Sequence, residues 1–151
     1  MTHPNEAYQQ WLEHPEDFKL LERIPFTQKS AQWPLHLFDP VGDEIEMVIL
    51  DTETTGLSAA DDAIIELGMV KLMYSKSLNR ITSIEDVISV YEDPQRPISE
   101  FVTRLTGITD EMVKDQHIDS AWVAEWLSNK PLIVAHTAQF DRPFFEELFQ
   151  N

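Results

Sequence analysis

A short apolar run that leads directly into two acidic residues is the feature that most constrains the fold of this 151-residue chain. Residues 45–50 read Ile-Glu-Met-Val-Ile-Leu, and Asp51 and Glu53 follow. A mostly apolar run of this length predicts a β-strand that is buried on both faces. Because residues i and i+2 of a strand share a face, both carboxylates should point the same way, with Thr52 on the other side.

Two carboxylates at the end of an apolar strand suggest a cation site. Burial and mutual repulsion penalise both charges unless a cation binds between them. The chain has no cysteine, and none of its five histidines are spaced i, i+4, so any metal would be held by oxygen, which favours Mg²⁺ or Mn²⁺. The alternative is that Asp51 and Glu53 merely end a strand at a solvated loop, and the Asp-x-Glu pattern alone favours that alternative.

The rest of the chain predicts an α/β fold with a mixed sheet. Two further apolar runs are separated by a turn near residues 76–80, which indicates antiparallel hairpin connections. After Pro94 the apolar spacing becomes helical, with Ser99 as an N-cap and Gly107 as a stop. The expected elements, in chain order, are strands at 45–50, 63–73 and 81–91, helices beginning near Ser99, Thr109 or Asp110, and Asp119, a strand at 132–135 and a helix at 141–149.

Residues 1–44 have a different character. They contain five prolines and no clean strand pattern, so we expect a short helical and extended N-terminal arm ahead of a main domain at 45–151. The polar N-terminus lacks the features of a signal peptide, and no run of 18 apolar residues occurs. We therefore expect a cytoplasmic protein without a membrane partner.

Three segments resemble the DnaQ-like, DEDD-type 3′–5′ exonucleases, a family that includes the proofreading epsilon subunit of DNA polymerase III and stand-alone bacterial members. Residues 51–57, Asp-Thr-Glu-Thr-Thr-Gly-Leu, with Ile-Ile-Glu-Leu-Gly at 64–68, resemble the family's first motif and next strand. Residues 135–141, Ala-His-Thr-Ala-Gln-Phe-Asp, resemble its second motif, and 105–109, Leu-Thr-Gly-Ile-Thr, resemble a loop beside the substrate. Three matches in the family's order favour a metal site over a plain strand end.

The resemblance implies an RNase H-like fold with a metal centre for catalysis. Asp51, Glu53 and Asp141 would be the catalytic residues and would bind two Mg²⁺ or Mn²⁺ ions. Such a pair of ions suits in-line attack of water on a terminal phosphodiester, without a protein nucleophile. On local grounds Asp141 has another interpretation, as a helix N-cap ahead of Pro143, and both roles can hold at once.

The resemblance also implies a set of substrate contacts. The backbone amides of Thr54 and Thr55 would meet the 3′-terminal nucleotide, Leu57 would wedge against its base, and Ile108 and Phe140 would wall the pocket. Each of these apolar residues, taken alone, is more often core than contact, and Glu66 could either reach the terminal sugar or be tied to its own sheet. The expected substrate-binding residues are Thr54, Thr55, Gly56, Leu57, Glu66, Thr106, Ile108, His136 and Phe140.

The chain departs from the family pattern in two ways. Thr137 replaces the usual asparagine of the second motif, so an amide donor is lost. The family's third motif, His-x-Ala-x-x-Asp or a tyrosine version, should follow the helix at 141–149 and supply the general base and a fourth carboxylate. Because the sequence stops at Asn151, we expect the N-terminal two-thirds of the domain, with no general base, little activity of its own, and apolar surface that favours self-association.

The composition limits how such a nuclease can bind. A formal net charge of −16 argues against a long, tight footprint on nucleic acid, because phosphate binding relies on Lys and Arg. The leading hypothesis is an exonuclease that acts on single-stranded or frayed DNA 3′ ends in a full-length parent, with a polymerase or another protein as partner. The alternatives are an exoribonuclease that trims small RNAs and a catalytically inactive nuclease-like module that binds proteins.

Overall fold

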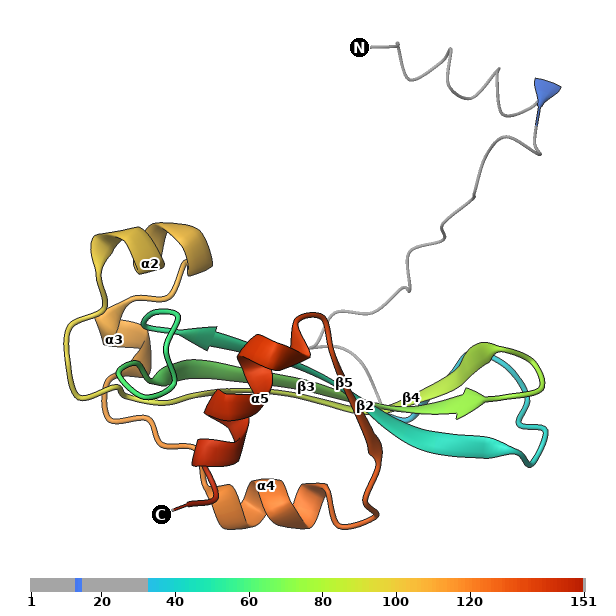
Figure 1. Ribbon diagram of the computed structural model, residues 1–151. Helices are drawn as coiled ribbons and strands as arrows, with labels where there is room; N and C mark the ends of the chain where they lie inside the picture. Colours follow the sequence, from blue (N-terminus) through green and yellow to red (C-terminus); the bar gives the residue numbers. More distant parts are fainter. Residues whose placement is uncertain (1–12, 15–32, 151) are drawn as a thin grey trace. The chain divides into compact units, whose positions relative to one another are not determined.

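The computed structural model describes residues 13–14 and 33–150 of the chain. The chain divides into two units, Met1–Ala31 and Gln32–Asn151. The helices expected in the N-terminal arm lie outside the described residues. In the described residues, the second unit consists of a mixed sheet and short helices (Figure 1).

Three long strands form the antiparallel centre of the sheet, as the sequence predicts. They are β2 (Glu44–Thr54), β3 (Ile64–Ser75) and β4 (Arg80–Tyr91). A two-residue strand, β1 (Leu35–His36), pairs antiparallel with β4, so part of the expected arm belongs to the sheet. The last strand, β5 (Leu132–Ala135), pairs parallel with β2, which gives the order β1-β4-β3-β2-β5.

Three short helices connect β4 to β5, and a fourth follows β5. They are α2 (Glu100–Thr106), α3 (Asp110–Val113), α4 (Ser120–Trp126) and α5 (Ala138–Glu147). No helix in the described part of the chain combines the length and apolarity needed to cross a membrane.

The N-caps of α2, α3 and α4 are among the residues that the sequence predicts for this role. Ser99, Thr109 and Asp119 each accept a backbone N–H through the side chain at the helix start. Gly107 ends α2 with φ 80°, a left-handed conformation that glycine adopts without steric cost. Local side-chain chemistry therefore sets these helix ends.

The start of α5 differs from the prediction. The helix begins at Ala138, three residues early, with Thr137 as an N-cap that makes no side-chain capping bond. Asp141 lies in the first turn, so its interpretation as the N-cap is wrong. Pro143, which suggested a later start, lies inside the helix, where one backbone bond is lost. Burial of Phe144 and Phe145 against the sheet offsets that loss.

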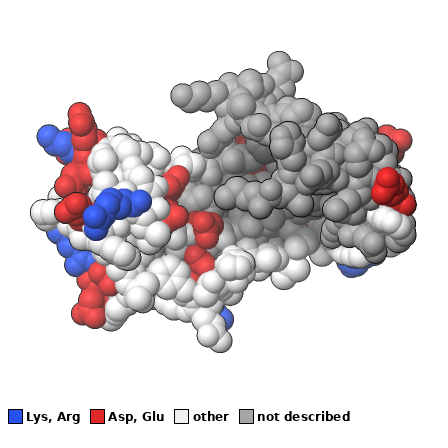
Figure 2. Space-filling model, turned by 90° about the horizontal axis from the view of Figure 1, so that it is seen from above, with Lys and Arg blue, Asp and Glu red and all other residues white. Residues whose placement is uncertain are grey.

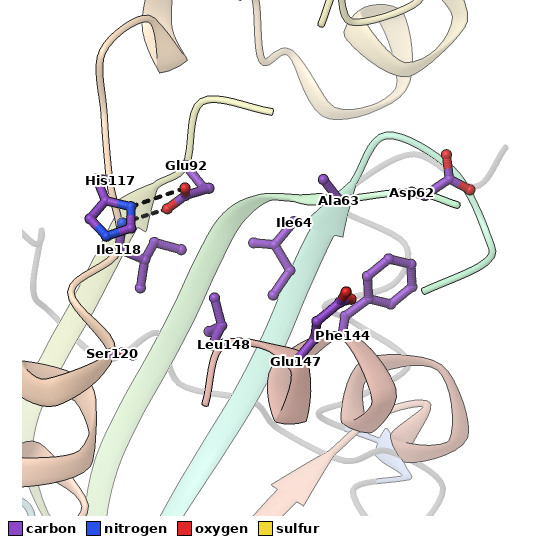
Figure 3. A pocket seen from close by; sticks show the side chains of 10 residues that line it. All are labelled: Asp62, Ala63, Ile64, Glu92, His117, Ile118, Ser120, Phe144, Glu147 and Leu148. Atoms are coloured by element: carbon purple, nitrogen blue, oxygen red, sulfur yellow. Dashed lines mark hydrogen bonds and ion pairs between the residues drawn. The ribbon is translucent and has the colours of Figure 1, made fainter. Parts of the chain in front are cut away.

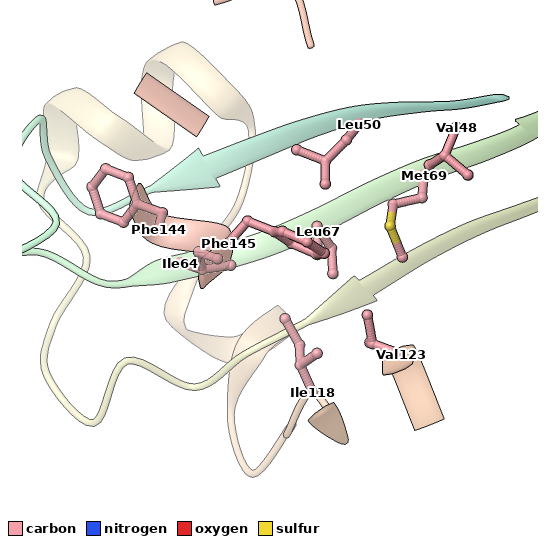
Figure 4. Packing of buried hydrophobic residues seen from close by; sticks show 9 residues of the cluster. All are labelled: Val48, Leu50, Ile64, Leu67, Met69, Ile118, Val123, Phe144 and Phe145. Atoms are coloured by element: carbon pink, nitrogen blue, oxygen red, sulfur yellow. The ribbon is translucent and has the colours of Figure 1, made fainter. Parts of the chain in front are cut away.

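The main core lies between one face of the sheet and helices α4 and α5 (Figure 4). Ile118 and Val123, on either side of the Asp119 cap, are both buried there, as a hydrophobic staple requires. This packing fixes α5, and with it Asp141, against β2. The buried members of the cluster are Val48, Leu50, Ile64, Leu67, Met69, Ile118, Val123, Phe144 and Phe145.

A second cluster holds the α2–α3 segment near the start of β3. Ile64 and Ile65 are adjacent and yet both are buried, because the β2–β3 register shifts between Glu53 and Thr54. The shift turns Ile64 into the first cluster and Ile65 into the second. The buried members of the second cluster are Ile65, Ile98, Val102, Ile108 and Val113.

The prediction that β2 is buried on both faces is wrong in the described chain. Val48 and Leu50 are buried on the α5 side, whereas Ile49, which points the other way, is 44 % exposed. Leu132 and Val134 of the neighbouring β5 are 55 % and 38 % exposed. An apolar part of the second sheet face is therefore open at the β2–β5 end.

Candidate active site

Asp51 and Glu53 lie near the end of β2, on the face opposite the main core. The intervening Thr52 points inward and is 6 % exposed, so the alternation is the predicted one. Across the ladder, Asp51 is opposite Gly68 and Glu53 is opposite Glu66 of β3. Directly opposed strand residues have close side chains, so Glu66 is a neighbour of the carboxylate pair.

Asp141 is brought to the same strand end by the first turn of α5. Its Oδ1 accepts hydrogen bonds from the backbone N–H of Thr52 at 3.1 Å and from the Thr52 hydroxyl at 2.9 Å. The Asp141 side chain is buried, with 2 % exposure. Thr52, which lies between Asp51 and Glu53 of the first motif, therefore connects that motif to Asp141 of the second motif.

The electrostatics show that these carboxylates interact. Burial, and then the charge of Asp141, raise the pKa of Asp51 above its ordinary value of 3.8, while the nearby His136 acts in the opposite direction. Burial, and then the charges of Asp51 and Glu66, raise the pKa of Glu53 above 4.5. A bound cation would relieve this repulsion.

The donor set fits a hard cation, but the coordination shell is not closed. The carboxylates near the end of β2 provide oxygen ligands, which are the ligands that Mg²⁺ and Mn²⁺ prefer. Among the described residues, however, no three histidine or acidic side chains converge closely enough to hold one metal ion. Binding would require the side chains to turn toward a shared point.

Glu66 is tied to its own sheet. Its Oε1 accepts a hydrogen bond from the hydroxyl of Ser89 on β4 at 2.5 Å. Glu66 still contributes to the raised pKa of both Asp51 and Glu53. It therefore belongs to the electrostatic environment of the pair while a neighbouring strand orients it.

The loop after β2 uses most of its polar groups internally. The Thr54 hydroxyl donates to the carbonyl oxygen of Gly56 at 2.6 Å, and the backbone N–H of Thr55 donates to the carbonyl of Ala63 at 2.9 Å. The Thr55 amide is thus engaged inside the loop rather than open to a nucleotide. Leu57, in contrast, is 86 % exposed.

Leu57 and Phe140, two of the predicted substrate contacts, border the same pocket. The pocket has a volume of about 320 Å³ and lies between the loop after β2 and the start of α5. Thr137, the residue that replaces the family's asparagine, also lines it. Its hydroxyl lies 3.4 Å from Nδ1 of the exposed His136. The other lining residues are Ala59, Gln139, Pro143 and Phe144.

Ile108 does not line an open pocket. It is 2 % exposed and packs in the second core cluster, and its place in the wall of a substrate site stays a prediction. Thr106 serves the same turn: its hydroxyl donates to the carbonyl of Val102 and accepts the N–H of Ile108. The left-handed Gly107 between them turns Ile108 inward.

Two other hollows lie near the site. A mainly apolar pocket of about 260 Å³ lies beside Asp141, between β5 and α5, and is lined partly by Leu50 and Phe145. A second pocket, of about 300 Å³, is bordered by Ile64, Phe144 and the pair Glu92–His117 (Figure 3). Neither Asp51 nor Glu53 lines the second pocket, so it is separate from the candidate metal centre.

Two residues of the site were missed by sequence reasoning. Thr52 binds Asp141, and Arg96 donates to the loop after β2 through both terminal nitrogens. The inward direction of Thr52 was a usable signal, because it points toward whatever packs on β2. Arg96 lies on an irregular segment after β4, and no local pattern indicates its contacts.

The surface around these elements is acidic. Asp and Glu side chains are spread over the described part of the face seen in Figure 2, with a few Lys and Arg side chains among them. The whole chain carries a formal charge of −16. The described part of this face shows no basic stripe like that of a protein that binds long nucleic acids.

Comparison with known proteins gives a consistent result at the family level. The family model RNase_T, described as exonuclease, matches residues 48–149. A PolC-type DNA polymerase III from Caldanaerobacter subterraneus is 41 % identical over 105 residues, which cover 68 % of this chain and 7 % of that protein. The Bacillus subtilis protein of the same name is 38 % identical over 113 residues, 72 % of this chain and again 7 % of the relative. The chain thus spans a small part of the curated relatives that it matches.

Solved structures share the fold. A structure of exonuclease I aligns with a TM-score of 0.53 at 18 % identity, over 70 % of this chain and 24 % of that one. E. coli exonuclease I in complex with an oligonucleotide aligns with a TM-score of 0.52, over 70 % of this chain and 23 % of that one. At this identity the likeness concerns the fold, and it confirms the RNase H-like α/β architecture with a mixed sheet.

Proposed function

Because this chain belongs to the DnaQ-like, DEDD-type family of 3′–5′ exonucleases, we propose that, within its full-length parent, it removes nucleotides from the 3′ ends of DNA. DNA is the proposed substrate because the relatives are named DNA polymerases. A polymerase is the proposed partner for the same reason. The activity would then be the editing of newly synthesised ends.

One observation carries this proposal. The two hydrogen bonds from Thr52 fix Asp141 at the strand end that carries Asp51 and Glu53. The charge of Asp141 contributes to the raised pKa of both other carboxylates. We propose that Asp51, Glu53 and Asp141 hold two divalent cations, Mg²⁺ or Mn²⁺.

The roles of the chain's own groups follow from their positions. The cations would supply activation of water and stabilisation of the leaving 3′ oxygen. Asp51 and Glu53 would hold them from the sheet, and Asp141 from the helix. Leu57 and Phe140, on the rim of one pocket, would take the terminal base between them and fix the scissile bond beside the carboxylates.

The charge of the protein sets the expected mode of binding. With a net charge of −16, the chain gains little from phosphate neutralisation, so divalent cations and apolar contacts must supply most of the affinity. We propose that the binding site contacts only one or two terminal nucleotides. DNA binding should therefore depend strongly on the divalent cation.

The 151 residues alone should hydrolyse DNA slowly. In the family a third motif supplies the general base and a fourth carboxylate, and we assign neither role to a residue of this chain. General-base catalysis contributes about 10²–10⁴-fold. We therefore expect the full-length parent to exceed the isolated chain by at least about that factor.

The test is directional digestion by the full-length parent. Single-stranded DNA labelled at its 5′ end should shorten from the 3′ end with Mg²⁺ or Mn²⁺, and not with chelator. Glu53→Gln should abolish this, whereas Glu125→Gln, on the exposed surface of α4, should not. Shortening from the 5′ end, or full activity of Glu53→Gln, would overturn the proposal. Faster digestion of an all-ribose oligonucleotide of the same sequence would indicate that the substrate is RNA rather than DNA.

A further inference from the structure

The loop between β2 and β3 is closed by bonds within itself. The Thr55 hydroxyl donates to Oδ1 of Asp62 at 3.2 Å, and Oδ2 of Asp62 accepts the backbone N–H of Ser58 at 3.1 Å. The N–H of Asp62 also donates to the carbonyl of Ser58 at 2.7 Å. The carboxylate of Asp62 is thus the centre of the loop, which carries the exposed Leu57 at its tip.

Arg96, which lies outside this loop in the sequence, binds three of the loop's residues. Its Nη1 donates to the carbonyl of Asp61 at 2.7 Å, and its Nη2 donates to the Thr55 hydroxyl at 2.6 Å. Nη2 also forms an ion pair with Oδ1 of Asp62 at 3.3 Å. A planar guanidinium can make this three-point contact, whereas a lysine ammonium lacks the fork.

The hydroxyl of Thr55 uses all of its hydrogen-bonding positions in this arrangement. The Thr55 hydroxyl donates to Asp62 and accepts from the N–H of Ala63 and from Arg96, which uses its one donor and both acceptor positions. The backbone at Gly56 is in close contact with Asp62, because a Cβ at this position would lie 2.4 Å from Oδ2. A loop with this many internal contacts has little freedom to change shape.

Leu57 needs such support. An apolar side chain that is 86 % exposed gains free energy by folding back onto neighbouring apolar groups, such as Ala59 or Phe140 in the pocket it borders. A flexible loop would allow that collapse. A rigid loop would keep Leu57 extended above the pocket before any substrate arrives, which would remove an ordering cost from binding.

We propose that Arg96 is a positioning residue for substrate binding, which acts through Asp62 and Thr55 to hold Leu57 in its extended position. This inference rests on the proposed exonuclease function. Arg96 differs from a general surface cation because its three donor contacts all fall on the loop that carries Leu57. Removing it should loosen that loop while the core clusters stay intact.

A first experiment needs no enzymatic activity. Hydrogen exchange of the backbone amides at 56–61 is measured in the 151-residue chain for wild type, Arg96→Gln, Arg96→Lys and Arg104→Gln. Arg104 is a matched control, because its ion pair is with the exposed Glu100 of its own helix, α2. Exchange of the loop should quicken about tenfold in Arg96→Gln, less in Arg96→Lys, and not in Arg104→Gln. Unchanged exchange in Arg96→Gln would overturn the proposal, whether or not the parent is a nuclease.

A second experiment asks whether Arg96 acts through Leu57. In the full-length parent, KM and kcat are measured on single-stranded DNA with 2-aminopurine at its 3′ end, for Arg96→Gln, Leu57→Ala and the double variant. We expect KM to rise about tenfold in Arg96→Gln with kcat within about twofold, and no further rise in the Leu57→Ala background. Additive effects of the two changes would overturn the proposal. A wild-type parent that leaves the DNA intact would contradict the proposed function, and the exchange experiment would then decide on Arg96 alone.

Discussion

Asp141 accepts two hydrogen bonds from Thr52, one from its backbone N–H and one from its hydroxyl, although the two residues are 89 positions apart in the chain. Thr52 lies between the two carboxylates of the first motif and points away from them. A single residue of β2 therefore sets the distance between the helix carboxylate and the strand carboxylates. Both the stability and the metal affinity of the site should depend on it.

Replacing Thr52 by valine keeps the shape of the side chain and removes one donor to Asp141. Hydrogen bonds to charged groups contribute about 1.5–3 kcal/mol, so the free energy of unfolding should fall by about that amount. Thr52→Ser keeps the hydroxyl and should lose less. Urea denaturation of the three proteins checks this. Equal stability of Thr52→Val and wild type would show that the hydrogen bond from the Thr52 hydroxyl does not stabilise the fold.

The carboxylate pair should make stability depend on pH in an unusual direction. Because folding raises the pKa of Asp51 above 3.8 and that of Glu53 above 4.5, the folded state binds protons more tightly. This contribution lowers the free energy of unfolding as the pH rises from the ordinary pKa values through the raised ones. Asp51→Asn should therefore be more stable than wild type near pH 7, and the difference should vanish below about pH 3. Thermal unfolding at both pH values tests this, and a destabilised Asp51→Asn near neutrality would contradict it.

Divalent cations should bind at the same pair. Calorimetric titration of the 151-residue chain with Mn²⁺ should show weak binding, because no closed shell of three ligands is present among the described residues. Asp51→Ala should abolish the heat signal and Glu125→Ala should retain it. Binding that survives in Asp51→Ala would show that the ions bind elsewhere on this acidic surface.

The packing of α5 should control both the fold and the site. Phe145 is 8 % exposed in the main core, and truncation of such a residue to alanine costs about 3–5 kcal/mol. Phe149, which is 42 % exposed, forms an edge contact with the Phe145 ring and is the matched control on the same segment. Phe145→Ala should lower the unfolding midpoint in urea far more than Phe149→Ala. Similar midpoints would mean that α5 docks mainly through Phe144.

The open sheet edge should promote self-association. In the described residues β5 is the terminal strand of the sheet order, and its Leu132 is 55 % exposed. Unpaired strand edges with apolar neighbours favour pairing between chains. We expect sedimentation at increasing protein concentration to detect self-association of the wild-type chain, which Leu132→Lys should reduce and Leu105→Lys, at a residue 73 % exposed on α2, should not. An equal effect of both changes would point to net charge rather than to the edge.

Much of this architecture follows from local sequence signals. The strands come from apolar runs, and the starts of three helices come from Ser99, Thr109 and Asp119, whose side chains cap them. The start of α5 was mispredicted because Thr137 makes no capping bond, so the helix end depends on tertiary packing.

The candidate site likewise has some features that follow from sequence signals and others that depend on tertiary packing. The shared face of Asp51 and Glu53 follows from strand periodicity. Leu57 and Phe140, which the family resemblance singles out, line one pocket. The burial of Ile108 and the contacts of Arg96 do not follow from sequence signals, because both depend on how distant segments pack. Residue type and spacing therefore predict which groups are present, whereas long-range packing decides which of them face solvent.

The parallel pairing of β5 with β2 has a consequence for the order of events during synthesis. Val48 lies opposite Ile133, so this part of the sheet cannot form until the residues of β5 have left the ribosome, long after those of β2. A nascent chain would carry Asp51 and Glu53 on a finished hairpin while Asp141 is still untranslated. The three carboxylates that we propose as metal ligands therefore come together only late in synthesis, because a long stretch of sequence separates Asp141 from Asp51 and Glu53.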